Sequence, residues 1–189
     1  MTQESEEIHE QQKTKDKPLT KKYTWKEVKD IIKTSDLSLL RRNQEQEKDY
    51  QKFRSQLRKE WTSVLDYILV TKFDWRKEIT DAKQWTAISP QDRYETRLVL
   101  CRNDFPYYME SNIDHWILWK LDGRSGIGSN LNTITNNEIE QAKIDLCANK
   151  DNRFEDRNVK ILDILHWINP PHLKSLPDID HVHILTLRQ

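Results

Sequence analysis

Two histidines near the carboxyl end of the chain, His181 and His183, are separated by a single residue. On a β-strand, side chains two positions apart point to the same face, roughly 6.6–6.8 Å apart along the chain. Neutral imidazole ligates zinc, copper, iron or nickel, and it also titrates near neutral pH as an acid–base group. The spacing therefore predicts either a functional pair or two polar side chains satisfied at a sheet surface.

A third histidine, His115, lies in another segment of alternating polarity. If the two strands are neighbours in a sheet, His115 faces the same pocket as His181 and His183. Three histidines from two strands resemble a three-ligand zinc site with an open fourth position. The same residues also suit a metal-free acid–base cluster. We therefore predict His115, His181 and His183 as catalytic residues, and as candidate ligands of a divalent metal such as zinc.

Asp104 is the fourth candidate for a catalytic role. It follows Asn103 and precedes Phe105–Pro106, and a short polar pair before proline usually forms a turn. The alternative places Asp104 at the mouth of the pocket, as a partner of a histidine or as a ligand. No serine or cysteine stands in a recognisable nucleophile motif, so metal or acid–base chemistry is what remains for an enzyme.

The segments that must position these residues are predicted to be strands preceded by helices. Residues 113–121 alternate in polarity, with His115, Ile117 and Trp119 on one face and Trp116 and Leu118 on the other. Further strands are predicted at residues 159–168 and 181–187. Helices are predicted from Thr24, over 39–72, from Ser89–Pro90 to before Asn103, and from Thr135 or Asn136. This order predicts an α+β fold with N-terminal helices packed on a small, mainly antiparallel C-terminal sheet.

An aromatic and aliphatic stripe marks the predicted helix over residues 39–72. Its members recur every three or four residues without an intervening Gly or Pro, and we interpret them as core packing rather than as a ligand surface. The stripe consists of Tyr50, Phe53, Leu57, Trp61, Val64 and Ile68.

Composition excludes several classes of protein. The 31 basic and 31 acidic residues cancel, so no net charge recruits nucleic acid or an anionic membrane surface, and we expect neither as a partner. Three glycines leave no room for a phosphate-binding loop or a dinucleotide fingerprint.

Residues 1–22 are poor in apolar side chains and are predicted to be a disordered tail, followed by one domain over 23–189. Cys101 and Cys147 form no disulfide framework, which favours a reducing compartment, the cytosol or the nucleus, and we expect a cytoplasmic location.

Four segments together resemble a known family. They are Asn-Asp-Phe-Pro-Tyr at 103–107, His-Trp-Ile-Leu-Trp-Lys at 115–120, Trp-Ile-Asn-Pro-Pro-His-Leu-Lys-Ser-Leu-Pro at 167–177 and His-Val-His-Ile-Leu at 181–185. In this order they resemble a fungal family of uncharacterised domains, which includes N-acetylglucosamine-induced protein 1 and a yeast protein named for a histidine triad with a channel. The likeness covers roughly residues 24–189.

The resemblance implies a cytoplasmic α+β domain with a histidine cluster and a link to N-acetylglucosamine response or metabolism. Carried over by residue, the cluster is His115, His181 and His183. Nucleotide hydrolases with a His-x-His-x-His motif share the triad name, but Leu185 stands here in place of their third histidine. That departure argues against their mechanism.

Three interpretations of the histidines follow. The cluster binds a divalent metal or relays protons in an enzyme whose substrate is an amino-sugar compound held against tryptophan. Alternatively, it belongs to a non-catalytic module that binds such a small molecule and regulates a partner. In the third, the histidines satisfy one another and the backbone inside a purely structural domain.

Overall fold

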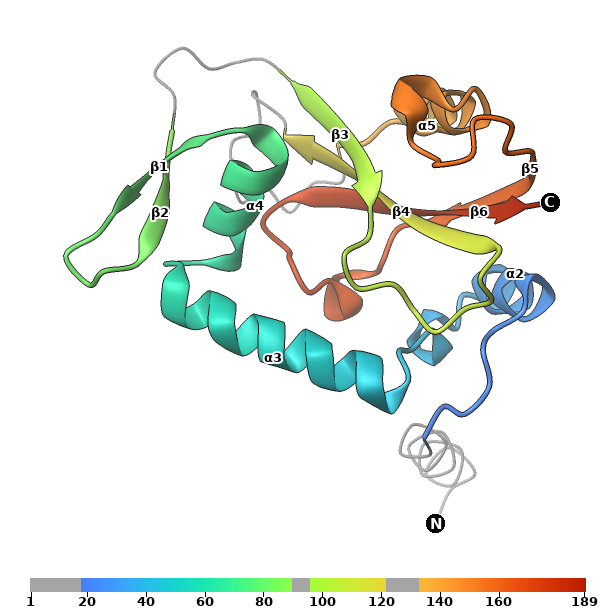
Figure 1. The fold of residues 1–189 in the computed structure, drawn as a ribbon, viewed down its shortest axis with the longest axis horizontal. Coiled ribbons are helices and arrows are strands. Elements are labelled where there is room, and N and C mark those ends of the chain that lie inside the picture. Colours follow the sequence, from blue (N-terminus) through green and yellow to red (C-terminus); the bar gives the residue numbers. More distant parts are fainter. Residues whose placement is uncertain (1–17, 90–95, 122–132) are drawn as a thin grey trace.

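The computed structural model describes residues 18–89, 96–121 and 133–189. Within these ranges the chain forms four α-helices, two antiparallel sheets and three short 3-10 turns, an α+β arrangement as predicted (Figure 1). The elements in chain order are α2 Trp25–Thr34, η1 Leu37–Leu39, α3 Gln44–Glu60, α4 Val64–Phe73, β1 Arg76–Ile79, β2 Trp85–Ile88, β3 Arg97–Arg102, β4 Ile113–Leu121, α5 Asn136–Cys147, η2 Lys150–Asn152, β5 Ile161–Trp167, η3 Pro171–Leu173 and β6 Asp180–Arg188.

The larger sheet has the order β3-β4-β6-β5, and every neighbouring pair is antiparallel. Strands β4 and β6 lie at its centre and are buried along most of their lengths because layers of helix cover both faces. In their register, Ile117 is opposite His183 and Trp119 is opposite His181. Residues directly opposite one another point to the same face, so this register decides which side chains meet.

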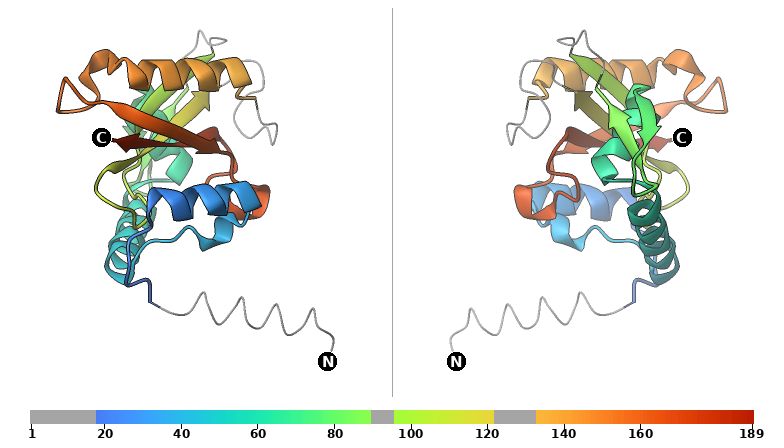
Figure 2. Two further views of the ribbon diagram at one scale, coloured as in Figure 1. Left: turned by 90° about the vertical axis from the view of Figure 1, so that its right-hand side faces the viewer. Right: turned by 90° about the vertical axis from the view of Figure 1, so that its left-hand side faces the viewer.

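Helix α5 covers one face of the sheet, as the side views in Figure 2 show. Its apolar residues Ile139, Ala142 and Leu146 pack against Trp116 and Leu118 of β4. The helix begins at a capping box formed by Thr135 and Glu138, the start that the sequence predicts.

Helices α2, α3 and α4 lie on the opposite face (Figures 1 and 2). Phe73 of α4 packs in a cluster with Ile117 and Trp119 of β4, whereas Val28 of α2 packs with Ile113 and Leu185. This arrangement confirms that the residues of β4 separate onto two faces as their alternation predicts. It also places the face that carries His115, His181 and His183 under the helices.

The prediction of one helix over residues 39–72 is wrong. The chain forms η1, α3 and α4, and Trp61 adopts an extended conformation between the last two. Trp61 makes a β-bridge with Trp85, and the Ser63 side chain accepts a hydrogen bond from the Asp66 backbone N–H to start α4. The apolar spacing continues across the break because both helices present apolar side chains to the same interior.

The predicted helix from Ser89–Pro90 to before Asn103 is also wrong where the structure describes it. Residues 90–95 lie outside the described ranges, and Arg97–Arg102 form strand β3, paired along its whole length with β4. Pairing with a buried strand outweighs the local helical signal. The hairpin of β1 and β2 was not predicted, since its strands are only four residues long.

The predicted strands at 159–168 and 181–187 are confirmed as β5 and β6. Of the predicted tail, residues 1–17 lie outside the described ranges, and so does the whole glycine-containing segment 122–132. Among the described residues, no helix is long and apolar enough to cross a bilayer.

Candidate functional site

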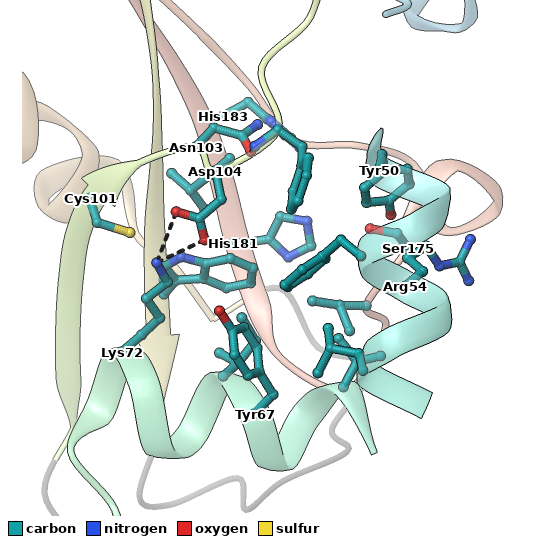
Figure 3. A pocket seen from close by; sticks show the side chains of 18 of the residues that line it. Tyr50, Arg54, Tyr67, Lys72, Cys101, Asn103, Asp104, Ser175, His181 and His183 are labelled. Carbon is teal, nitrogen blue, oxygen red and sulfur yellow. Dashed lines mark hydrogen bonds and ion pairs between the residues drawn. The ribbon is translucent and has the colours of Figure 1, made fainter. Parts of the chain in front are cut away.

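A cavity of about 420 Å³ lies between the helical layer and the histidine-bearing face of the sheet. Helices α3 and α4 form one wall, strands β4 and β6 form the other, and the segments after β3 and around η3 complete it (Figure 3). Volumes of roughly 300–1,000 Å³ are typical of small-molecule sites.

The apolar stripe of the sequence forms a wall of this cavity. Tyr50, Phe53 and Leu57 from α3 line it, together with Val64 and Ile68 from α4. The interpretation of the stripe as core packing alone is therefore incomplete.

The sheet brings the three predicted histidines together. His115, His181 and His183 are 4%, 4% and 7% exposed, and their side chains share one face. His115 Nε2 lies 2.9 Å from His183 Nδ1, and the ring centroids of His181 and His183 are 5.5 Å apart. His181 and His183 line the cavity, whereas His115 lies behind them.

A chain of hydrogen bonds fixes the protonation of two of these rings. The Trp167 indole N–H can only donate, and it lies 2.9 Å from Asn169 Oδ1, so the Asn169 amide group faces His183 Nε2 at 3.0 Å. His183 Nε2 therefore accepts, and its Nδ1–H donates to His115 Nε2. Both histidines are neutral, each with its proton on Nδ1.

Aromatic rings hold this chain in place. The Trp167 ring is stacked on His183 with a centroid distance of 4.9 Å and an interplanar angle of 7°, and Tyr107 is stacked on His115 at 5.2 Å. Asn103 Nδ2 lies 3.3 Å from both nitrogens of the His115 ring, and its Oδ1 accepts the Phe105 backbone N–H. The polar chain is thus enclosed by residues of the four segments that carry the resemblance.

His181 differs from the other two histidines. Its Nδ1 lies 3.0 Å from the Ile179 carbonyl oxygen, which can only accept, so Nδ1 carries the proton and Nε2 carries a lone pair. In the described part of the chain, no hydrogen bond occupies Nε2. Figure 3 shows the His181 ring projecting from β6 into the middle of the cavity. His181 therefore offers the cavity a hydrogen-bond acceptor of fixed orientation.

Burial lowers the pKa of all three histidines. Loss of solvation, followed by the positive charge of Arg42, lowers the pKa of His115 to about 3. Burial also lowers the pKa of His183 well below its usual value, with further lowering by His115, His181 and Arg42. For His181 burial again lowers the pKa, although the hydrogen bond to Ile179 opposes the shift. All three are neutral at pH 7, and for His115 and His183 the hydrogen bonds require it.

Asp104 lines the cavity, and its described partner is a lysine. Its carboxylate lies 3.0 Å from Nζ of Lys72 on α4, across the cavity from Arg54 and Tyr50 (Figure 3). Burial is the largest influence on Lys72 and lowers its pKa, but the hydrogen bond to Asp104 and the charge interactions with Cys101, Asp104 and Tyr67 together raise the pKa above its usual value. Among the described residues, no hydrogen bond or ion pair joins Asp104 to a histidine, so the geometry does not support a role for Asp104 in orienting one.

Sequence reasoning did not single out Asn169, Lys72 or Arg54, although all three line the cavity. Asn169 could have been identified from the sequence, because it lies in the 167–177 segment, two positions after its hydrogen-bond donor Trp167. Lys72 and Arg54 are two of 31 basic residues on helices with many charges, and no local signal separates them from a solvated face.

Metal ligation by His115, His181 and His183 stays a prediction. Among the described residues, no three His, Cys, Asp or Glu side chains are grouped so as to hold a metal ion. His115 Nε2 and His183 Nδ1 face one another in a hydrogen bond, which a metal bound to either nitrogen would break. Elemental mass spectrometry of the native protein beside a His181→Ala/His183→Ala variant tests the prediction.

Fold and site together define an α+β protein with a polar, histidine-lined cavity between its sheet and its helices. Residues 24–187 match the family described as "Protein of unknown function (DUF3605)", and the chain belongs to this family. It is 24% identical over 179 residues to N-acetylglucosamine-induced protein 1 of Candida albicans (strain SC5314 / ATCC MYA-2876), covering 86% of this chain and 67% of that protein. These matches confirm the family expected from the four motifs.

One solved structure is also similar. The crystal structure of HTC1 superposes with a TM-score of 0.47 at 20% sequence identity, covering 87% of this chain and 85% of that chain.

Proposed function

We propose that this chain is a cytoplasmic protein of the N-acetylglucosamine response that binds an amino sugar, or a derivative of one, in the cavity. The observation that carries the proposal is the cavity itself, with the orientated His181 Nε2 in its middle. The similarity to a protein named for induction by N-acetylglucosamine supports the choice of ligand. Two free thiols, Cys101 and Cys147, support the location, since both fit a reducing compartment.

The lining suits a hydroxylated ring. Tyr50 and Phe53 each pack against Phe105, with ring centroids 5.2 and 4.7 Å apart, and Phe53 also meets Tyr67 at 5.6 Å. Such rings offer flat apolar surface to the C–H faces of a sugar, while hydroxyl groups at their edges offer hydrogen bonds. His181 Nε2 supplies an acceptor for a sugar hydroxyl or an amide N–H.

The experiment is isothermal titration calorimetry of N-acetylglucosamine into the purified protein and into a His181→Ala variant. We expect saturable binding to the native protein and at least a tenfold weaker affinity in the variant, because the acceptor nitrogen is lost. His166→Ala is the matched control. His166 is opposite Ile184 on the α5 side of the same sheet, so its loss leaves the cavity unchanged.

Two outcomes would count against the proposal. Absence of saturable binding by the native protein for N-acetylglucosamine and its derivatives would overturn it directly. Equal affinities in the native, His181→Ala and His166→Ala proteins would show that the sugar binds elsewhere. Thermal unfolding of each variant, measured in parallel, establishes that all three proteins are folded.

A further inference from the structure

The cavity is surrounded by more positive than negative charge. Four basic side chains line it, against two acidic ones: Arg42, Arg54, Lys72 and Arg102, with Glu47 and Asp104. The histidines add no charge, since each is neutral. Lys72 pairs with Asp104, Arg42 lies 3.4 Å from Glu47, and Arg102 lies 2.6 Å from Asp114, so the charges of these three basic side chains are compensated by carboxylates.

Two of the arginines, Arg42 and Arg54, lie near the same aromatic ring, that of Tyr50. The Arg42 guanidinium carbon lies 4.0 Å from the centroid of Tyr50, and that of Arg54 lies 5.6 Å from the same centroid. Arg42 is fixed further by Nε and Nη2, which donate to the Phe105 carbonyl oxygen. Guanidinium groups stacked on an aromatic face lose less conformational freedom when they bind an anion, because their planes are already orientated.

Arg54 retains its donors for a ligand. In the described part of the chain, no carboxylate lies within ion-pair distance of its guanidinium, which carries five N–H donors. Figure 3 shows Arg54 beside Tyr50 and Ser175 on one side of the cavity, with His181 between this group and the Lys72–Asp104 pair. The positive charge of Arg42 also acts on His115 and His183, so its field extends into the interior of the site.

We propose that the ligand of this cavity is an anionic sugar, whose phosphate or carboxylate is bound by Arg54 beside Arg42 on Tyr50, while a ring hydroxyl donates to His181 Nε2. This inference rests on the proposed function and specifies the class of ligand. Arginine forks bind both phosphate and carboxylate oxygens in pairs of parallel hydrogen bonds. A neutral sugar makes only the second of these contacts and binds more weakly.

The test is calorimetric titration of four probes at low and at moderate salt: N-acetylglucosamine, N-acetylglucosamine 6-phosphate, glucuronate and inorganic phosphate. We expect an anionic sugar to bind at least tenfold more tightly than N-acetylglucosamine, with a preference that shrinks as salt rises. Comparison of the 6-phosphate with glucuronate distinguishes the two sources of charge. The variant Arg54→Gln should lose most of the preference, because its affinity for the anionic sugar should fall much more than its affinity for N-acetylglucosamine.

Arg58→Gln is the matched control, since Arg58 is exposed one turn further along α3 and does not line the cavity. Equal affinities for neutral and anionic sugars in the native protein would overturn the inference and leave the proposed function intact. An equal loss for both sugars in Arg54→Gln would overturn it as well. If inorganic phosphate bound as tightly as the sugar phosphate, the site would recognise the anion alone, and the inference of an anionic sugar would be overturned. If the native protein bound none of the sugars, the proposed function itself would fail.

Discussion

The buried histidine cluster predicts that the protein loses stability in mild acid. In the folded state burial lowers the pKa of His115 to about 3, whereas histidine in an unfolded chain titrates near 6.5. Between these values the unfolded chain binds more protons than the folded one, so the free energy of unfolding rises with pH and falls as pH decreases through 6.5. Full stability is present above the unfolded pKa.

The size of the effect follows from the two pKa values. With values near 3 and 6.5, His115 alone lowers the free energy of unfolding by about 2 kcal/mol between pH 8 and pH 5. Burial shifts the pKa of His183 and of His181 in the same direction, so both add to the loss. A loss of this size is a large fraction of the ~5–15 kcal/mol that stabilises a typical domain.

The assay is urea unfolding at half-unit intervals from pH 8 to pH 5, for the native protein and for His115→Gln. The glutamine oxygen can accept the His183 Nδ1–H bond, so the variant keeps the contact but removes one titrating group. We expect the pH dependence in the variant to be shallower by about 2 kcal/mol over this range. His172→Gln, at an exposed position in η3, is the control.

One result would refute this reasoning. If His115→Gln and the native protein lost stability in parallel as pH fell, His115 would not be the buried neutral group that the structure describes. If His172→Gln reduced the pH dependence of the free energy of unfolding as much as His115→Gln did, the conclusion would be the same.

Two further predictions concern the packing and charges around α5. Leu146→Ala should lower the free energy of unfolding by about 3 kcal/mol, because Leu146 is fully buried. Ile144→Ala, at a 58% exposed position, should lower it by less than about 0.5 kcal/mol. Urea unfolding measures both. Glu138→Gln should cost about 2 kcal/mol because it leaves the 8% exposed Lys120 side chain without its carboxylate, whereas Glu140→Gln on the exposed side of α5 should cost less than about 0.5 kcal/mol. Equal costs within either matched pair would contradict the burial on which the prediction rests.

The central strands and the histidine cluster could be predicted from sequence because their signals are local. The alternation in residues 113–121 separates Trp116 from His115, and the structure places these side chains on opposite faces of β4. The one-residue spacing of His181 and His183 likewise fixed their common face. That His115 joins them depended on the adjacency of β4 and β6, which the sequence analysis assumed and the structure shows.

The rest of the site depends on contacts between distant parts of the chain. Lys72 meets Asp104 across 32 positions, and Trp167 and Asn169 reach His183 only after η3 turns the chain back into the sheet. Strand β3 was mistaken for a helix because its pairing with β4 outweighs its local propensity. The division of α3 from α4 depends on the contact between Trp61 and Trp85, which lie 24 positions apart.

The hydrogen-bond chain from Trp167 to His115 has a direction, and a single indole N–H sets it. If the Asn169 amide turned over and presented its oxygen to His183, the His183 proton would move to Nε2 and every bond as far as His115 would reverse. The Trp167 side chain therefore selects one of two opposite directions for the same chain of hydrogen bonds. The two states differ in which imidazole nitrogens carry hydrogen, so nitrogen NMR spectra of His115 and His183 would show the direction of the chain.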